Sequence, residues 1–316
     1  MASHTKGEIL HIVEFCLFVT TEIAFVAGLI TQVFILAVIA VDWGRGRRLS
    51  TADQVIVSIM ISRILLHSVI QMNMFWTHFC AVCSFISSMI LRMIFFSTMY
   101  STTWLSTLLC VVFYFKISIF RNVLFLWLKR LFSKCILHFI IAVLLISAGQ
   151  TSAIYLVTFL TEKNYFSFNL THGYRQQPSD VVFSMYLVNM LAPLVIILLS
   201  SLFLIIYLHL HIRHMRGSRK VTTSMDAYNR IIKYTASTIF TCGLCFTISG
   251  LAEKFYDVFG FVLVSFPWTI SGTLHSVLLI FMTPKLKTPI YRLFKYFSNY
   301  GINREEPRDL ITTIAT

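Results

Sequence analysis

Arg63 is an ionisable residue within a long apolar stretch of the sequence. It lies about 12 residues, or about 18 Å at 1.5 Å per residue, from the inner end of the helix expected there. A guanidinium at the centre of a membrane-spanning helix costs about 2.5–3.5 kcal/mol on insertion scales, so it needs acceptors on neighbouring helices. Gln32 and Ser276 lie in two other apolar stretches, about 13 Å and about 11 Å above their inner ends. We therefore expect these three side chains to meet at one level, with His275 beside them.

This polar cluster has two interpretations. It is either a buried clamp that fixes how the helices pack, or a hydrogen-bond network that rearranges when the protein is activated. The two are compatible. His67 and His275, which also lie in apolar stretches, are interpreted as packing histidines rather than as metal ligands.

A second set of side chains is expected in the outer half of the same bundle. Trp104 lies roughly 24 Å above the inner end of its helix, with Thr107 and Leu108 within one turn of it. It is either a packing aromatic or the wall of an outward-facing ligand cavity. Because the set is mostly aromatic, with no carboxylate deep in the outer half, it favours apolar or neutral ligands over amines. The other candidate lining residues are Tyr186, Asn189, Phe246, Ser265 and Trp268.

Motifs for catalysis and for metal binding are missing from the sequence. It contains no His-Glu-x-x-His, Gly-x-Ser-x-Gly, P-loop or Gly-x-Gly-x-x-Gly pattern. Two Cys-x-x-Cys pairs, Cys80/Cys83 and Cys242/Cys245, are about 160 residues apart, and one is expected within a span, which disfavours a zinc site. We expect neither an enzyme nor a resident cofactor or metal.

The overall composition explains why these side chains would lie in a membrane. Of the 316 residues, 57% are hydrophobic and only 12% are charged. Soluble domains carry about 25% charged residues, so the composition excludes a soluble enzyme, a disordered chain and a secreted disulfide scaffold. The net charge of +13 is attributed to membrane topology rather than to nucleic-acid binding.

Seven stretches are apolar and long enough to cross a bilayer, which takes about 20 residues. They predict an all-α, seven-transmembrane helix bundle of the G-protein-coupled receptor type, a single domain over residues 1–288. Residues 289–316 are expected to form a tail whose basic and aromatic segment, 289–300, is a short helix on the membrane surface. The seven stretches are 15–41, 52–76, 88–120, 136–159, 181–208, 231–251 and 261–283.

The basic residues predict the orientation of the bundle. Of the 26 Lys and Arg, 20 fall in the tail and in the connections after the first, third and fifth stretches, counted with Lys116 at the end of the third stretch and Lys233 at the start of the sixth. Because cytoplasmic segments gather Lys and Arg, the N-terminus is expected outside and the C-terminus inside. Asn169, in the only Asn-x-Thr/Ser sequon, then lies in an outer loop and is a candidate glycosylation site.

Several segments, in order and at matching spacings, resemble the type 2 taste receptors, which are bitter taste receptors. They are VDWGRGRRLSTADQVIVSIMISR at 41–63, WLSTLLCVVFYFKIS at 104–118, FLWLK at 125–129 and HSVLLIFMTPKLK at 275–287. Pro193, Leu208, His211 and Met215 match the pattern of the fifth span. Departures include Gln32 and Thr283, where the family has asparagine, so the resemblance is to a divergent member.

The resemblance implies a plasma-membrane receptor for bitter small molecules that signals through a heterotrimeric G protein of the gustducin-like or inhibitory class. Trp104 would line the ligand pocket and Arg63 would belong to the inner polar network. Lys116, His211 and Met215 would lie on the G-protein side. The basic inner loops suit both anionic membrane lipid and a G protein.

Two alternatives stay open at this point. One is a vomeronasal type 1-like pheromone receptor, against which the KIS and HS…KLK segments argue. The other is a polytopic transporter, which usually has internal repeats and broken helices; neither is apparent here. Nothing in the sequence indicates the oligomeric state.

Overall fold

The computed structural model describes residues 2–79, 85–117, 123–166, 180–215, 221–254, 256–283 and 285–292. Nearly all of them are helical, which confirms the predicted all-α class. The long helices are α1 (Ala2–Gly44), α2 (Thr51–Phe79), α3 (Phe85–Ile117), α4 (Val123–Phe166), α5 (Asp180–Met215), α6 (Val221–Lys254) and α7 (Tyr256–Met282).

Six of these helices contain an apolar stretch long enough to span a membrane. The stretches are His11–Gly44, Thr51–Trp76, Met89–Phe115, Leu126–Leu156, Val188–Tyr207 and Phe261–Met282. In α6 the described apolar stretch is shorter, Thr235–Ser249, so the predicted span at 231–251 is not confirmed. The chain is a multi-pass helical membrane protein.

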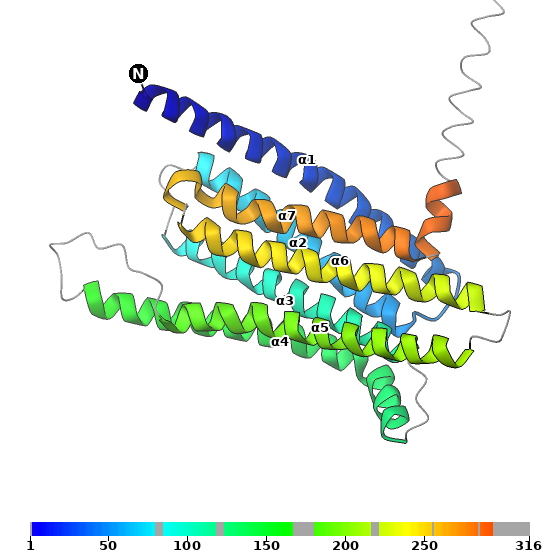
Figure 1. Ribbon diagram of the computed structural model, residues 1–316. Coiled ribbons are helices and arrows are strands. Elements are labelled where there is room, and N and C mark those ends of the chain that lie inside the picture. Colours follow the sequence, from blue (N-terminus) through cyan, green and yellow to red (C-terminus); the bar gives the residue numbers. More distant parts are fainter. Residues whose placement is uncertain are drawn as a thin grey trace, which may run out of the picture.

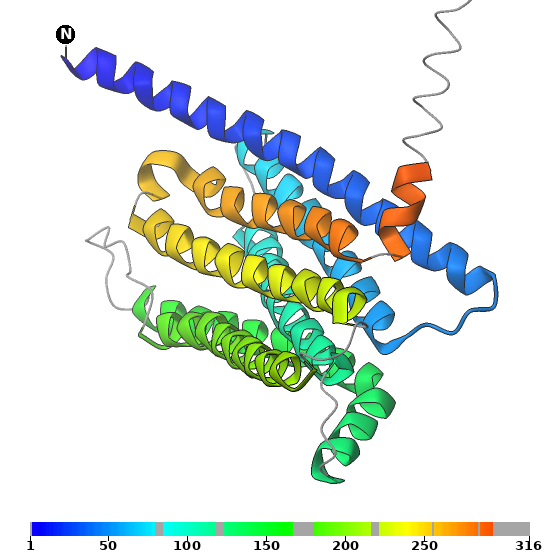
Figure 2. The ribbon, with the colours of Figure 1, turned by 45° about the vertical axis from the view of Figure 1, so that its right-hand side comes forward.

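The helices lie side by side in one bundle, with α3 at its centre (Figures 1 and 2). Helix α3 packs against α2, α4, α5 and α6, whereas α7 lies between α1 and α6. The N-terminal end of α1 projects past its neighbours in both views. After α7, residues 285–292 form a short helix, which begins before the predicted segment 289–300; residues 293–316 lie outside the described part.

The bundle exposes apolar side chains and buries polar ones. Ile30 of α1, Leu145 of α4 and Phe240 of α6 are each more than 60% exposed. Thr21, Gln32, Asn189, Ser265 and Ser276 are buried. Lipid is as apolar as leucine, so polar groups in a membrane are placed between helices, where they can bond one another. This distribution agrees with the predicted membrane location.

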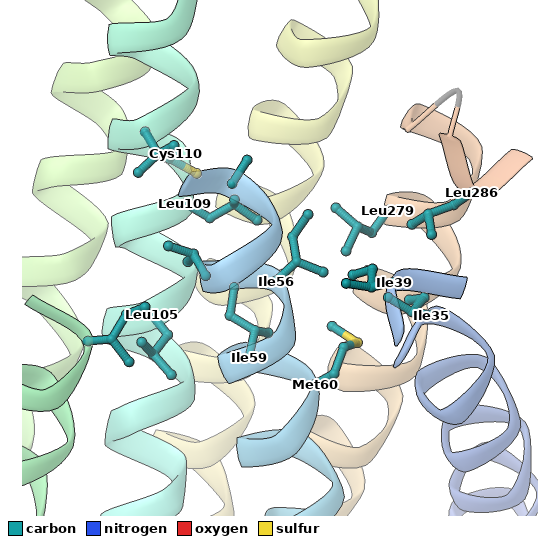
Figure 3. Close-up of a cluster of buried hydrophobic side chains, with 14 of the residues drawn as sticks. Ile35, Ile39, Ile56, Ile59, Met60, Leu105, Leu109, Cys110, Leu279 and Leu286 are labelled. Atoms are coloured by element: carbon teal, nitrogen blue, oxygen red, sulfur yellow. The ribbon is translucent and has the colours of Figure 1, made fainter. Parts of the chain in front are cut away.

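Two apolar clusters fill the bundle. The inner cluster joins α1, α2, α3, α4, α5 and α7. It is drawn in Figure 3, with Ile35, Ile56, Ile59, Leu105 and Leu279 among its buried members. Leu286 of the short helix 285–292 also belongs to it. The outer cluster contains Phe95, Tyr100 and Met190, and Phe246 and Trp268 pack against it. Both clusters contain side chains of α2, α3 and α7, so these helices are packed together along most of their length.

Gly28 lets α1 approach α2 and α7 closely. A Cβ atom at this position would lie 2.5 Å from Thr273 Oγ1 and 2.8 Å from His67 Cε1. Thr273 cannot easily move, because its hydroxyl is held 2.7 Å from the Ala24 carbonyl oxygen and 2.9 Å from that of Thr269. His67 is itself buried. The sequence therefore needs a residue without a side chain here.

We expect Gly28→Ala to lower the free energy of unfolding by about 1–3 kcal/mol, the usual cost of overpacking. The measurement is thermal unfolding of the purified protein, together with its abundance at the cell surface. Gly149→Ala is the matched control, since a Cβ at Gly149 on α4 would meet nothing within 4 Å. Equal destabilisation by both substitutions would contradict the close-packing explanation.

Candidate functional site

The Arg63 guanidinium bonds side chains and backbone of two other helices. Its Nη1 donates to the Gly272 carbonyl oxygen and to Ser276 Oγ of α7, each at 3.2 Å. Its Nη2 lies 3.5 Å from Ser106 Oγ of α3. Arg63 is only 4% exposed, so these acceptors hold a buried charge. One side chain of α2 thus connects α3 and α7.

Both serines are oriented to accept a hydrogen bond from Arg63. The Ser106 hydroxyl donates to the Thr102 carbonyl oxygen at 2.8 Å. The Ser276 hydroxyl donates to the Gly272 carbonyl oxygen at 2.8 Å. Because each hydroxyl has one hydrogen, its oxygen lone pairs remain available to the guanidinium. The predicted contact between Arg63 and Ser276 is therefore present, and Ser106 adds to it.

Gln32 does not join this network by hydrogen bonds. Its side chain is fully buried in α1, and neither atom of its amide has a hydrogen-bond partner among the described residues. Gln32, Arg63 and Ser276 were expected to meet because they lie at similar depths in their helices. Contact also requires each side chain to point toward the others around its helix axis. His275 is buried beside Ser276 on α7.

Trp104 of α3 reaches α5 in the outer part of the bundle. Its indole Nε1 donates to Asn189 Oδ1 at 3.4 Å. Asn189 is 1% exposed, whereas Trp104 is only partly buried. Thr107 is buried and donates to the Thr103 carbonyl oxygen at 3.0 Å. Leu108 is partly buried against the inner cluster. The Trp104 ring is thus fixed by a polar contact at its edge.

A second tryptophan, Trp268 of α7, is held in a similar way. Its Nε1 donates to Ser249 Oγ of α6 at 3.1 Å. Phe246 of α6 and Trp268 both pack against the outer cluster. Ser265 is fully buried, and its hydroxyl donates to the Val262 carbonyl oxygen at 3.1 Å.

The outer cluster connects the surroundings of the two tryptophans. Tyr100 lies one helical turn from Trp104, and Met190 is next to Asn189; both belong to the cluster that packs against Trp268. Neither was predicted as a site residue. The sequence does indicate Tyr100, because it precedes Trp104 by four residues and therefore lies on the same face of the helix. The structure therefore gathers aromatic side chains of α3, α6 and α7 with a few hydroxyl and amide groups.

Some predicted site residues lie outside the described structure. The side chains of Tyr186, Lys116, His211 and Met215 are not described, although their backbones belong to α5 and α3. Asn169 lies outside the described residues altogether. Their roles stay predictions.

A cluster of charged residues at the end of the bundle was not predicted. Lys285 Nζ lies 3.1 Å from Asp42 Oδ2 and 3.2 Å from Asp53 Oδ2. Arg47 is 3.7 Å from Asp42. Asp53 also accepts a hydrogen bond from the Ser50 backbone at 3.2 Å, and its own backbone N–H donates to Ser50 Oγ at 3.2 Å. This pair is a capping box that begins α2. Lys285 therefore joins the ends of α1 and α2 to the short helix after α7.

Burial alone would lower the pKa of Lys285, but its hydrogen bonds to Asp42 and Asp53, and their charges, raise it above the ordinary value of 10.5. A lysine whose pKa is higher in the folded than in the unfolded protein stabilises the fold below about pH 10. This stabilisation is lost as the pH rises through the folded-state pKa. The contribution of Lys285 is therefore constant across neutral pH.

We expect Lys285→Met to lower the free energy of unfolding by about 1 kcal/mol, the upper range for partly exposed ion pairs. The loss should shrink in concentrated salt, since salt screens the wild-type contacts. Lys287→Met is the control, because Lys287 is exposed and lies 5.5 Å from the ring centre of Tyr291 rather than between carboxylates. Unfolding at low and high salt measures the difference; a salt-independent loss would contradict an ionic origin.

Comparisons with known proteins identify the family. The chain is 27% identical over 302 residues to taste receptor type 2 member 3 of Pongo pygmaeus, covering 87% of this chain and 92% of that protein. It is 28% identical over 299 residues to member 46 of Macaca mulatta, covering 90% and 94%. It is 28% identical over 280 residues to member 13 of Papio hamadryas, covering 83% and 90%. Since the family model for the taste receptor protein (TAS2R) also matches residues 9–297, the chain belongs to the TAS2R family of taste receptors.

Proposed function

We propose that this chain is a plasma-membrane bitter taste receptor with seven transmembrane spans, its N-terminus outside and its C-terminus inside the cell. Its family of G-protein-coupled taste receptors supports the class. The 20 of 26 basic residues that fall in one set of connections and the tail support the orientation. In this orientation α6 crosses the bilayer as the sixth span, and Asn169 is in an outer loop where it can be glycosylated.

The ligand pocket of the proposal lies beside Trp104, between α3, α5, α6 and α7. The single observation that carries it is the hydrogen bond from Trp104 to the buried Asn189, because it fixes a partly buried indole next to Met190 and one helical turn from Tyr100, two members of the outer cluster. Thr107, Leu108, Tyr186, Phe246, Ser265 and Trp268 are its other proposed lining residues. Aromatic, hydroxyl and amide groups suit neutral, largely apolar ligands. Family membership favours bitter compounds over pheromones or transported solutes.

Helix α3 is the proposed path from the ligand to the inner side. Trp104 faces α5, whereas Ser106, two residues later and about 200° around the helix, faces Arg63. A ligand that turns or shifts Trp104 therefore moves Ser106 relative to Arg63 on α2. Such a ligand activates the receptor only if it binds the active arrangement more tightly than the resting one. Ser276 and His275 belong to the same proposed network. Gln32, whose amide makes no hydrogen bond in the described structure, is placed there only by its depth in the bundle.

The proposed readout is an inner opening between Lys116 and the segment from His211 to Lys233, with Met215 on the same side. A heterotrimeric G protein of the gustducin-like or inhibitory class would bind there. The many basic residues of these connections suit an acidic protein surface and the inner membrane leaflet alike.

A calcium assay tests this function. Cells that express the chain with a promiscuous G-protein α subunit are challenged with a panel of bitter compounds, and untransfected cells serve as the control. Labelling of an N-terminal tag on intact cells measures surface abundance and orientation together. We expect at least one compound to raise calcium only in cells that express the chain. Silence of a correctly oriented surface protein across the panel would contradict the bitter-ligand proposal.

A further inference from the structure

The first turns of α4 carry a stripe of basic and apolar side chains on their exposed face. It consists of Trp127, Arg130, Lys134, Leu137 and Ile141, which we call the α4 stripe. All five are exposed, Trp127 and Leu137 by more than half. At about 100° per residue, their spacing places them within a sector of about 80° of the helix surface.

From Phe132 onward, the opposite face of α4 packs against the bundle. Phe132 stacks on Phe139 at 4.7 Å between ring centres and lies 4.9 Å from Phe115 of α3. Ile136 and Ile140 are buried in the inner cluster. Figures 1 and 2 show the first turns of α4 leaving the bundle at an angle to the rest of the helix. The α4 stripe therefore faces away from the other helices.

The positive charge of the α4 stripe is not neutralised nearby in the sequence. From Gln54 to Thr161 there is no acidic residue at all. In the part of the chain that the structure describes, neither Arg130 nor Lys134 makes an ion pair. Asp42 and Asp53 form ion pairs with Lys285 instead. Two cations on adjacent turns of one helix face are thus available to an anionic partner.

We propose that the α4 stripe binds an anionic phospholipid of the inner membrane leaflet. Arg130 and Lys134 hold the oxygens of its headgroup, since a guanidinium matches phosphate geometry and an ammonium adds a point charge. Trp127 lies at the membrane–water interface, where indoles concentrate. The acyl chains run along Leu137 and Ile141.

Lipid is favoured over a protein partner because the charged part of the α4 stripe continues directly into apolar side chains. Leu144 and Leu145 extend the exposed apolar face farther along α4, within the candidate span Leu126–Leu156. A water-soluble partner would meet only the charged end. The proposal rests on the orientation given above, which places the start of α4 at the cytoplasmic leaflet, where phosphatidylserine and other anionic lipids are found.

Lipid binding to the purified full-length chain tests the proposal. Native mass spectrometry measures the affinity for phosphatidylserine and, separately, for phosphatidylcholine. Arg130→Gln and Lys134→Gln should each weaken phosphatidylserine binding about fivefold, in line with the contribution of one basic residue near an anionic membrane surface. Lys129→Gln is the matched control: it removes the same charge from the same turn, but its side chain lies on the other side of the helix and is only partly exposed. Phosphatidylcholine binding should not change.

Equal weakening by all three substitutions would overturn the proposal in favour of diffuse attraction. If the glutamine variants bind phosphatidylserine as well as the wild-type chain does, but activate the G protein less in bilayers of phosphatidylcholine alone, the proposal is overturned in favour of a protein contact. Thermal unfolding shows whether each variant is folded. If a glutamine variant is unfolded, the wild-type chain still tests the proposal, because its binding of phosphatidylserine must weaken when salt is added. The binding measurement uses neither agonist nor G protein, so it can fail or succeed independently of the receptor function.

Discussion

Replacement of Arg63 with methionine is expected to lower the free energy of unfolding and to remove most of the agonist response at equal surface abundance. Methionine fills much of the volume but cannot donate to Gly272, Ser276 or Ser106. Hydrogen bonds to charged groups are worth about 1.5–3 kcal/mol each in soluble proteins, whereas interhelical hydrogen bonds of all kinds in a membrane average about 0.6 kcal/mol. We therefore expect a loss of about 2 kcal/mol for the three contacts together. Unfolding of the purified protein measures it.

A double-mutant cycle separates the contact with α3 from the rest. Ser106→Ala alone should cost less than Arg63→Met, and in the presence of Arg63→Met it should cost little more, since its partner is already gone. Ser201→Ala on α5 is the control, because among the described residues that hydroxyl donates to the Ile197 carbonyl oxygen of its own helix, at 2.6 Å, and to no other helix. Additive effects of Arg63→Met and Ser106→Ala would contradict a direct contact.

The cycle also decides between the two interpretations of the network. If the cluster is only a clamp, Ser106→Ala lowers stability but leaves the potency of an agonist unchanged in the folded receptor. If the cluster rearranges on activation, Ser106→Ala shifts the balance between resting and active arrangements, so potency or basal activity changes as well. The calcium response at matched surface abundance measures both quantities.

The sequence predicts the depth of a side chain in the bundle better than its direction. Arg63 and Ser276 were expected at one level from the rise per residue, and they are in contact. Gln32 was expected there by the same reasoning, but its amide makes no hydrogen bond in the described structure. Ser106 was missed although it binds Arg63. Depth follows from counting residues, whereas direction depends on how each helix is rotated against its neighbours, which no single helix determines.

Helix ends were also less predictable than spans. The fourth stretch was placed at 136–159, but α4 is Val123–Phe166. Lys129, Arg130 and Lys134 end the apolar pattern without ending the helix, since lysine and arginine are good helix formers. The contact of Lys285 with Asp53 joins residues 232 positions apart, and only the packing of the short helix against α1 and α2 brings them together. Hydropathy therefore indicates where the chain crosses the bilayer rather than where its helices begin.

The proposed pocket leads to the second large effect, at Trp104. Trp104→Ala is expected to raise the agonist concentration for half-maximal response about 30-fold or more, because an aromatic anchor that the bound ligand covers contributes about 2 kcal/mol or more. Trp104→Phe keeps an aromatic ring but removes the N–H that donates to Asn189. Its loss should be smaller, since the ring still contacts the ligand. The calcium response at matched surface abundance measures each variant.

Asn189→Leu tests how the indole is held, because leucine has a similar size to asparagine but accepts no hydrogen bond. If the contact with Asn189 orients Trp104, Asn189→Leu and Trp104→Phe should weaken the response by similar factors, and the double substitution should add little to either. Trp43→Ala is the control, since Trp43 is 67% exposed at the other end of the bundle. An unchanged potency in Trp104→Ala, or an equal loss in Trp43→Ala, would place the ligand elsewhere. A loss of potency confined to the Trp104 and Asn189 variants would locate the ligand between α3 and α5. The shortest connection from the ligand to Arg63 would then run along α3 from Trp104 to Ser106, two residues later.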